Sequence, residues 1–363
     1  QVEIENTRPS LFGAIMGFLS WPVSTSATAA SMDDVGGPFS ILSVEETECD
    51  AFKVTGTGSV IANDNIQVNS ECLSSALKRQ AGGMIVATDS HCNVHGGIQN
   101  EGGDETMLVC EAVEGAPRIP DPLDGLPDVR FPGMPGSAQQ VPDGSPTKKI
   151  PNGCPGSSSP ATMDSPSVCQ FPSNYKDTTW RLYPGAYPGG LKLLAGNFYL
   201  EPGVYWIGGG GLELTGNGSL VQSVETGGST FGGGVLFFNT AITGSNLGDM
   251  KLNGSSANIH LLPLNETDSP GWAPWYGLII YQDRDFGLDG DDLTINGNDS
   301  LGMDVRGTIY LPDGDVKING DEGDVVLDQV IAVTFDAQGN GGDILALRDD
   351  DYIFQFTAAG LVE

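Results

Sequence analysis

The chain has 363 residues, and its composition already excludes several classes of protein. Lysine and arginine total 16 against 47 aspartates and glutamates, a formal net charge of −31. A nucleic-acid binder is therefore excluded as the main interpretation, because phosphate binding requires clustered cations. Hydrophobic residues make up 39% of the chain, enough to bury a sizeable core.

Residues 1–31 predict a small β-α-β element. Val2, Glu3 and Ile4 alternate apolar and acidic side chains as a strand does, a helix is expected from Pro9 to Phe18, and an extended pattern resumes at residues 23–29. The apolar stretch 11–23 contains glycines and a proline and is too short to cross about 30 Å of hydrocarbon. The start of the chain also lacks the pattern of a signal peptide, so a processed N-terminus is expected if the protein is secreted. We expect this element to serve docking or assembly, with Val2, Glu3 and Ile4 as the strand that adds to a neighbouring copy.

Residues 32–114 consist of brief β-rich runs separated by glycine, asparagine and aspartate, and they predict the first layers of a β structure. Six cysteines lie in the first 169 residues, and none has the CxxC spacing of a zinc or redox site. Three disulfides are favoured over six free thiols, which indicates an oxidising compartment. The pairing favoured among the possibilities is Cys49–Cys72, Cys92–Cys110 and Cys154–Cys169.

Residues 115–175 are rich in proline, glycine and serine and predict an extended loop insertion held against the body. The segment contains Pro120-Asp121-Pro122-Leu123 near its start and Cys154 and Cys169 near its end. A disulfide between these two cysteines would close a loop of about 15 residues, and such a crosslink stabilises a fold by roughly 3 kcal/mol.

Residues 176–363 return to short aliphatic runs and form the main acidic part of the chain. An antiparallel sandwich or barrel and a parallel β-helix both accept many short strands at this spacing. The connections vary in length and are dominated by glycine, asparagine and aspartate, which tolerate the positive φ of tight corners. The sequence therefore favours a mainly β fold built as a right-handed parallel β-helix, a solenoid, over a sandwich.

Catalysis has little support in the sequence. The chain has three histidines, His91, His95 and His260, and no nucleophile elbow. The run 91–95 could supply zinc ligands, but Cys92 is better used in a disulfide. A polysaccharide-cleaving enzyme would need carboxylates beside a cation, for which residues 283–285 (Asp-Arg-Asp) are the candidate cluster, and a surface ion pair is the favoured interpretation of that cluster.

The acidic residues concentrate between positions 283 and 351, where 18 acids face 4 cations. Calcium takes six to eight oxygen ligands, so this region is a candidate calcium-binding region, although no EF-hand loop fits. A solvated acidic surface that keeps the protein in solution is the alternative. The candidate calcium ligands are Asp289, Asp291, Asp292, Asp313, Asp315, Asp321 and Asp324.

Two further features could carry function at the surface. Four N-x-S/T sequons in turn-like contexts are possible glycosylation sites: Asn217, Asn253, Asn265 and Asn298. Aromatic residues cluster at 171–206 and 272–276; exposed, they would stack on sugars or form contacts between subunits, and buried, they would belong to the core.

A set of motifs extends over the whole chain: residues 2–4, 11–17 and 23–29 at its start, residues 56–60 and 66–70 with Cys49 and Cys72, Pro120-Asp121-Pro122-Leu123, and the runs 200–207, 277–284 and 307–312. Together these motifs resemble the TadG-like proteins of Tad (Flp) pilus-assembly systems. The resemblance implies an envelope or cell-surface protein made with an N-terminal hydrophobic helix, which this sequence lacks. The missing helix favours a released, self-assembling product over a membrane-tethered component.

We therefore expect an extracellular or cell-surface structural subunit, not an enzyme, that assembles with itself or with a pilin-like partner into a filament. The alternatives are a surface adhesin that binds glycans through aromatic clusters and a calcium-bridged face, and a polysaccharide-cleaving β-helix enzyme. No cofactor is expected apart from possible Ca²⁺, and no partner nucleic acid or membrane span is expected.

Overall fold

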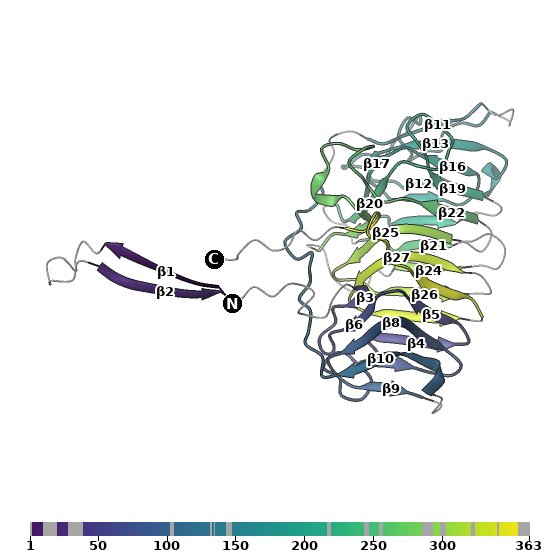
Figure 1. Ribbon diagram of the computed structural model, residues 1–363. Coiled ribbons are helices and arrows are strands. Elements are labelled where there is room, and N and C mark those ends of the chain that lie inside the picture. The colour runs from purple at the N-terminus through teal and green to yellow at the C-terminus, as the bar shows by residue number, and fades with distance from the viewer. Residues whose placement is uncertain are drawn as a thin grey trace. The chain divides into compact units, whose positions relative to one another are not determined.

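The computed structural model describes residues 2–9, 20–27, 39–101, 105–130, 133, 135–142, 147–215, 219–242, 247–253, 257–284, 293–297, 303–320, 324–339 and 341–354. The chain divides into two compact units, one of Gln1–Gly37 with Phe356–Glu363 and one of Pro38–Gln355. The cartoon in Figure 1 shows both, and each is described by itself below.

The first unit contains a two-stranded hairpin. β1 (Val2–Pro9) pairs antiparallel with β2 (Ser20–Ala27) over their whole length. The predicted assembly strand Val2–Ile4 lies in β1. Pro9, where the helix was predicted to begin, is the last residue of β1, and the rest of the predicted helix, residues 10–18, falls outside the described residues. The antiparallel pairing differs from the parallel strands of a β-α-β unit, and ten residues between the strands are fewer than a parallel crossover needs.

The second unit is mainly β and contains two long sheets whose strands, apart from the β11–β13 pair, run parallel among the described residues. The smaller sheet has the spatial order β12 (Cys169–Phe171), β15 (Leu191–Leu193), β18 (Leu212–Thr215), β21 (Met250–Asn253), β24 (Leu293–Asn296), β26 (Val316–Gly320), β28 (Phe335–Gly339), β4 (Phe52–Gly56), β7 (Leu77–Arg79) and β9 (Ile98–Asn100). Parallel sheets of this kind are what the sequence predicted for the body of the molecule.

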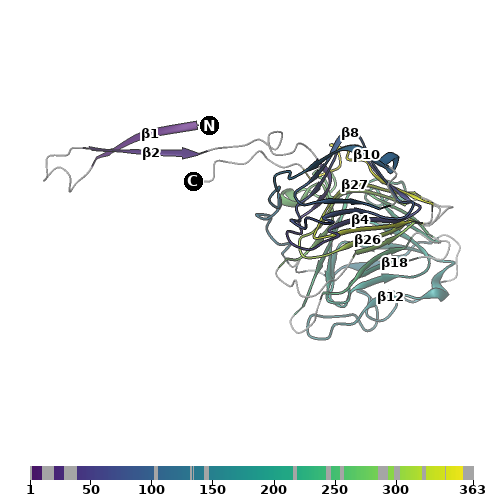
Figure 2. The same cartoon turned by 90° about the horizontal axis from the view of Figure 1, so that it is seen from below.

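The larger sheet follows the same course from one end of the unit to the other. Its strands are β11 (Ser137–Gln140), β13 (Thr179–Tyr183), β14 (Gly185–Tyr187), β16 (Asn197–Leu200), β17 (Gly203–Gly208), β19 (Ser219–Ser223), β20 (Val235–Thr240), β22 (Ala257–Leu261), β23 (Leu278–Gln282), β25 (Met303–Leu311), β27 (Val325–Ala332), β29 (Asp343–Ala346), β3 (Phe39–Ser43), β5 (Ser59–Ala62), β6 (Asn65–Val68), β8 (Met84–Val94) and β10 (Leu108–Glu114). Three 3₁₀ turns, η3 (Glu105–Met107), η4 (Ser173–Tyr175) and η5 (Ala273–Trp275), lie in connections. Figure 2 looks at the same unit from below. We call this unit the stack.

Equivalent positions of successive strands form continuous ladders of side chains through the stack. In the smaller sheet one buried ladder runs through Cys169, Leu191, Leu212, Met250, Leu293, Val316, Phe335, Phe52 and Leu77 to the half-buried Ile98. The next residue of each strand points to the other face, as the period of two requires. There Lys192 and Glu213 form an ion pair at 3.3 Å. The inward ladders are the core, and their burial is the main source of stability.

The layers do not follow chain order. The chain enters the stack in its middle, and β3, β4 and β5 pair in parallel with β27, β28 and β29 from the C-terminal part. We call this junction the seam. It requires close backbone approach, since a Cβ on Gly56, whose φ is +91°, would come within 2.1 Å of the carbonyl oxygen of Gly339. The N-terminal layers therefore extend from the seam to one end, and the C-terminal layers extend from it to the other.

Three disulfides join the cysteines in the pairing that the sequence favoured. Cys49 pairs with Cys72, Cys92 with Cys110, and Cys154 with Cys169. Cys92 and Cys110 link β8 to the terminal strand β10, while Cys154 and Cys169 are both buried in the core at the opposite end. The loop between Cys154 and Cys169 covers the end of the ladder. The part of the predicted insertion that this disulfide holds therefore forms a cap on the stack.

Candidate functional site

A strap, residues 115–130, runs along one side of the stack and carries the proline-rich motif noted in the sequence. Its first part is fixed to the N-terminal layers. Asn69 donates from Nδ2 to the carbonyl of Ile119 at 2.7 Å and accepts from the Ile119 amide at 3.0 Å. Arg118 donates to the carbonyls of Asn69 and Glu46 at 3.0 and 2.9 Å. The side chain of Ile119 is buried, so this segment belongs to the fold.

The middle of the strap is held by a cation from the C-terminal layers. Arg284 donates to the carbonyl of Leu123 at 2.6 Å, to the carbonyl of Asp124, and to the hydroxyl of Tyr310 at 2.7 Å. The Tyr310 hydroxyl in turn donates to the carboxylate of Asp121. Burial raises the pKa of the Tyr310 hydroxyl, and its hydrogen bond to Asp121 raises it further. This phenol therefore stays protonated and acts as a donor.

The last part of the strap reaches toward the capped end. Tyr281 donates to Oδ1 of Asp128 at 3.2 Å, and the indole of Trp275 donates to the carbonyl of Pro127 at 2.8 Å. Burial and the neighbouring Asp128 raise the pKa of Tyr281. The strap thus accepts hydrogen bonds from the five side chains named above, which project from the stack along its length.

This geometry changes the interpretation of the cluster 283–285. Arg284 binds main-chain carbonyls of the strap, and Oδ2 of the buried Asp283 accepts a hydrogen bond from Thr240, while Asp285 lies outside the described residues. The sequence offered two interpretations of this cluster, a catalytic group and a surface ion pair. Arg284 does form an ion pair with Oδ1 of Asp124 at 3.2 Å. Its hydrogen bonds to the strap also give it a structural role, which neither interpretation included.

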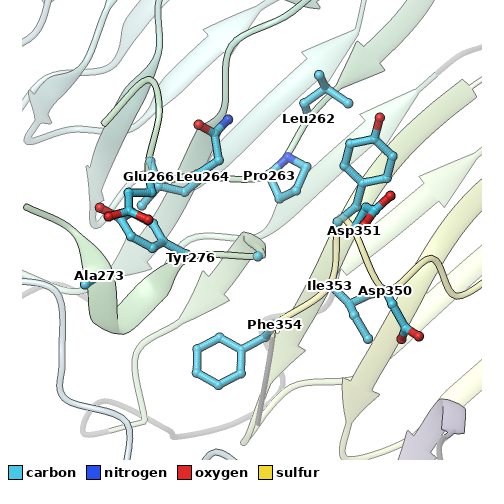
Figure 3. A pocket seen from close by; sticks show the side chains of 13 residues that line it. Leu262, Pro263, Leu264, Glu266, Ala273, Tyr276, Asp350, Asp351, Ile353 and Phe354 are labelled. Carbon is cyan, nitrogen blue, oxygen red and sulfur yellow. The ribbon is translucent and has the colours of Figure 1, made fainter. Parts of the chain in front are cut away.

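A lateral pocket of about 410 Å³ lies where the chain leaves the stack (Figure 3). It is formed by the segment after β22, by η5 with the residues that follow it, and by the segment after β29. Figure 3 shows Glu266, Ala273 and Tyr276 on one side and Asp350, Asp351 and Ile353 on the other. The remaining lining residues are Leu262, Pro263, Leu264, Asn265, Gly277, Tyr352 and Phe354.

The pocket depends on close backbone packing at Gly277. Its φ is +85°, and a Cβ there would lie 2.4 Å from backbone atoms of Ile353 and Phe354. Gly277 donates to the carbonyl of Leu264 at 2.8 Å and accepts from Thr308 at 2.7 Å, and the amide of Phe354 donates to Oγ1 of Thr308 at 2.9 Å. The wall formed by 350–354 is therefore part of the stack.

The pocket has an apolar floor and an acidic rim. Leu264 and Ile353 are buried, while Tyr276 and Tyr352 present aromatic rings. Glu266, Asp350 and Asp351 are exposed carboxylates, and Asp350 is paired with Arg348 at 2.7 Å. The pocket can therefore accept an apolar ring or a sugar face and can receive hydrogen bonds from its hydroxyl or amino groups.

Three of the predicted calcium ligands, Asp313, Asp315 and Asp324, lie among the described residues, and the structure does not bring them together. Among the described residues no group of three acidic, histidine or cysteine side chains is arranged to hold a metal ion. Asp315 accepts from Thr334 Oγ1 at 2.7 Å, Asp324 accepts from the Asp343 amide, and burial raises the pKa of Asp313. Asp289, Asp291, Asp292 and Asp321 lie outside the described residues, so calcium binding stays a prediction.

The zinc alternative at residues 91–95 loses its thiolate. Cys92 is in the disulfide with Cys110, the Nδ1 atom of His91 lies 3.4 Å from Glu111, and the Nδ1 atom of His95 lies 2.8 Å from the carbonyl oxygen of Ala116. His260 packs its ring edge against Phe231.

The sequons and aromatic clusters divide between surface and core. Asn253 and Asn265 are half-buried, and Asn265 is engaged in a turn with Asp268, whereas Asn217 and Asn298 lie outside the described residues. Most of the aromatic cluster at 171–206 is core: Phe171, Trp180, Tyr187, Phe198 and Tyr205 are fully buried. In the second cluster Trp275 is buried and Trp272 is half-buried.

Comparison of the chain with models of protein families, with curated proteins and with solved structures found no match in any of the three. The resemblance to TadG-like proteins therefore stays a prediction from sequence motifs. No helix among the described residues is long and apolar enough to cross a membrane.

Proposed function

We propose that the chain is an extracellular structural subunit that assembles with copies of itself or with a pilin-like partner into a filament or pilus-related appendage. Its body is a right-handed parallel β-helix. Support for the β-helix comes from the ladders, in which a strand pairs in parallel with the strand one layer further along the chain. Parallel crossover connections are almost always right-handed.

One observation carries the assembly proposal: the hairpin β1–β2 belongs to a unit separate from the stack. Neither strand has a second partner strand among the described residues. An isolated two-stranded hairpin is marginally stable in water, and an unpaired strand edge is a template for another chain. Such an element gains stability when it adds to a neighbour, which is the role proposed for Val2, Glu3 and Ile4.

The extracellular assignment is supported by the disulfides. All six cysteines are paired, and disulfides persist in oxidising compartments. The high negative charge agrees with a surface that stays dispersed in saline water.

Deletion of residues 1–8 tests the assembly proposal. Because the stack is a separate compact unit, the shortened protein should keep the circular dichroism spectrum and melting temperature of the full chain, and it should form no filaments by negative-stain electron microscopy. Filaments of normal length and number from the shortened protein would refute the role of the hairpin. A full chain that never assembles at any concentration would refute the function as a whole.

The lateral pocket favours a second candidate function, that of a surface adhesin for glycans. Tyr276, Tyr352 and Phe354 could stack on a sugar face, and Glu266 and Asp351 could accept hydroxyl hydrogen bonds. Replacement of Tyr352 by alanine should then abolish binding on a glycan array. Phe231, an aromatic residue of similar exposure outside the pocket, supplies the matched control, and its alanine variant should bind normally. Glycan binding that survives Tyr352→Ala would contradict a pocket adhesin.

A polysaccharide-cleaving enzyme is the third candidate. It gains little from the geometry, because Arg284, the cation of its candidate cluster, is committed to the strap.

A further inference from the structure

The two ends of the stack differ in how they finish. Figure 1 shows β9 and β10 at one end and β11 at the opposite end. At the β11 end the core is covered by the loop that Cys154–Cys169 closes. At the other end β10 has one strand partner, β8, within the described part of the chain. We call these the capped end (residues 147–178) and the open end (residues 98–101 and 105–114).

The open end exposes apolar surface and a strand edge. Ile98 and Leu108 are half-buried against the core, and Val109 is 46% exposed. The outer side of β9 is partly closed, because a carboxylate oxygen of Glu114 accepts from the Ile98 amide at 2.7 Å. The remaining outer edge of β10 is an unpaired strand edge of the kind that recruits another chain.

The charge of the open end indicates which surface of another copy can contact it. Among its described residues the open end holds four acidic residues and no lysine or arginine: Glu101, Glu105, Glu111 and Glu114. The capped end holds Lys148, Lys149 and Lys176 against Asp164 and Asp177, a net positive charge in a chain whose total is −31. Lys149 and Lys176 are exposed, and Lys148 lies over the ring of Tyr175 at 5.8 Å.

We propose that copies of the chain stack head to tail, with the open end of one copy against the capped end of the next. The inference rests on the proposed function as an assembling subunit and assigns it an interface. Two open ends would place acids against acids, which is destabilising, whereas an open end against a capped end pairs opposite charges. Head-to-tail stacking also keeps the strands of consecutive copies in one direction, apart from β11, which is antiparallel to β13. A contact between two different surfaces that does not close on itself generates a filament.

The net charge does not prevent this contact in saline. At physiological ionic strength the Debye length is about 8 Å, so repulsion between the distant parts of two bodies is largely screened. The charges that face each other across the two ends lie within that distance and retain their effect.

A charge-swap experiment tests the interface. One full-length variant carries Glu101→Lys, Glu105→Lys, Val109→Lys and Glu111→Lys at the open end, which makes this end net positive; Glu114 is left in place because it holds the Ile98 amide. A second variant carries Lys149→Glu and Lys176→Glu at the capped end. The first variant has two positive ends and the second has two negative ends, so each alone should associate at least about tenfold more weakly than the parent chain in sedimentation velocity. An equimolar mixture should recover the filaments, because every contact again joins opposite charges.

The outcomes separate this inference from the proposed function. Normal filaments from either variant alone would overturn the head-to-tail contact. The same holds if the mixture forms no filaments although both variants melt like the parent chain. In both cases filaments of the parent chain would still support the proposed function. Parent chains that form no filaments would instead refute the proposed function.

Discussion

Replacement of Gly277 by alanine should destabilise the stack through two separable effects. The φ of +85° places this residue in the left-handed region, where a side chain costs about 1–2 kcal/mol. The new Cβ would also lie 2.4 Å from backbone atoms of Ile353 and Phe354, so this wall must move. Ile353 is only 3% exposed, and exposing a buried isoleucine forfeits about 1.5–3 kcal/mol. The expected total loss is about 2.5–5 kcal/mol.

Gly271 supplies the matched control, because its φ is +102° and a Cβ there would meet no atom within 4 Å. Gly271→Ala should therefore lose only the backbone term of about 1–2 kcal/mol. Urea denaturation of the two variants beside the parent chain measures the difference, and limited proteolysis near Tyr352 reports whether the pocket wall has moved. Equal losses in the two variants, with no new cleavage in Gly277→Ala, would refute the packing argument.

Three further predictions concern charge, the strap and the cap. Burial raises the pKa of Asp328 to about 6, although the Gly307 amide and Arg306 oppose the shift, so the folded state holds this proton more tightly than the unfolded state. The contribution stabilises the fold at low pH and is lost as pH rises through 6. Relative to the parent chain, Asp328→Asn should therefore gain about 2 kcal/mol of stability between pH 4 and pH 8, and denaturation curves that keep a constant offset across this range would contradict it. Arg284→Met should lower the melting temperature and expose residues 121–128 to protease, while Arg130→Met at an exposed position should do neither. Unchanged cleavage in Arg284→Met would show that Arg284 does not hold the strap. Serine at both Cys154 and Cys169 should cost about 3 kcal/mol in the unfolding free energy measured with urea, and a loss well under 1 kcal/mol would show that the cap is held by its other contacts.

Features that depend on nearby residues were predictable from sequence. The disulfides join cysteines 23, 18 and 15 residues apart, so short spacing alone favoured the right pairing. The aliphatic runs at 191–193 and 204–207 lie in β15 and β17, because alternating or continuous apolar residues between glycines mark buried strands.

Features that join distant parts of the chain were not predictable. The seam pairs Ile41 with Val330, and nothing in either run of residues indicates its partner, since parallel ladders accept any aliphatic neighbour. The role of Arg284 depends on carbonyls about 160 residues earlier, so its local pattern suggested an active-site cluster or an ion pair. The lateral pocket was missed for the same reason, because its walls come from three separate segments; glycine at 277 beside a tyrosine was the available local signal.

The strap explains how a chain that begins in the middle of its own stack can hold together. Ten described strands of the smaller sheet, spaced by about 4.8 Å, separate the two ends by about 43 Å. The 22 residues 115–136 can reach about 73 Å when extended, so the connection is slack and its position must come from its contacts. Those contacts lie on both sides of the seam, at Asn69 on the N-terminal layers and at Arg284 and Tyr310 on the C-terminal layers. The strap therefore ties together two blocks that otherwise meet through strand pairing at the seam, and it leaves both ends of the stack free for contact with other copies.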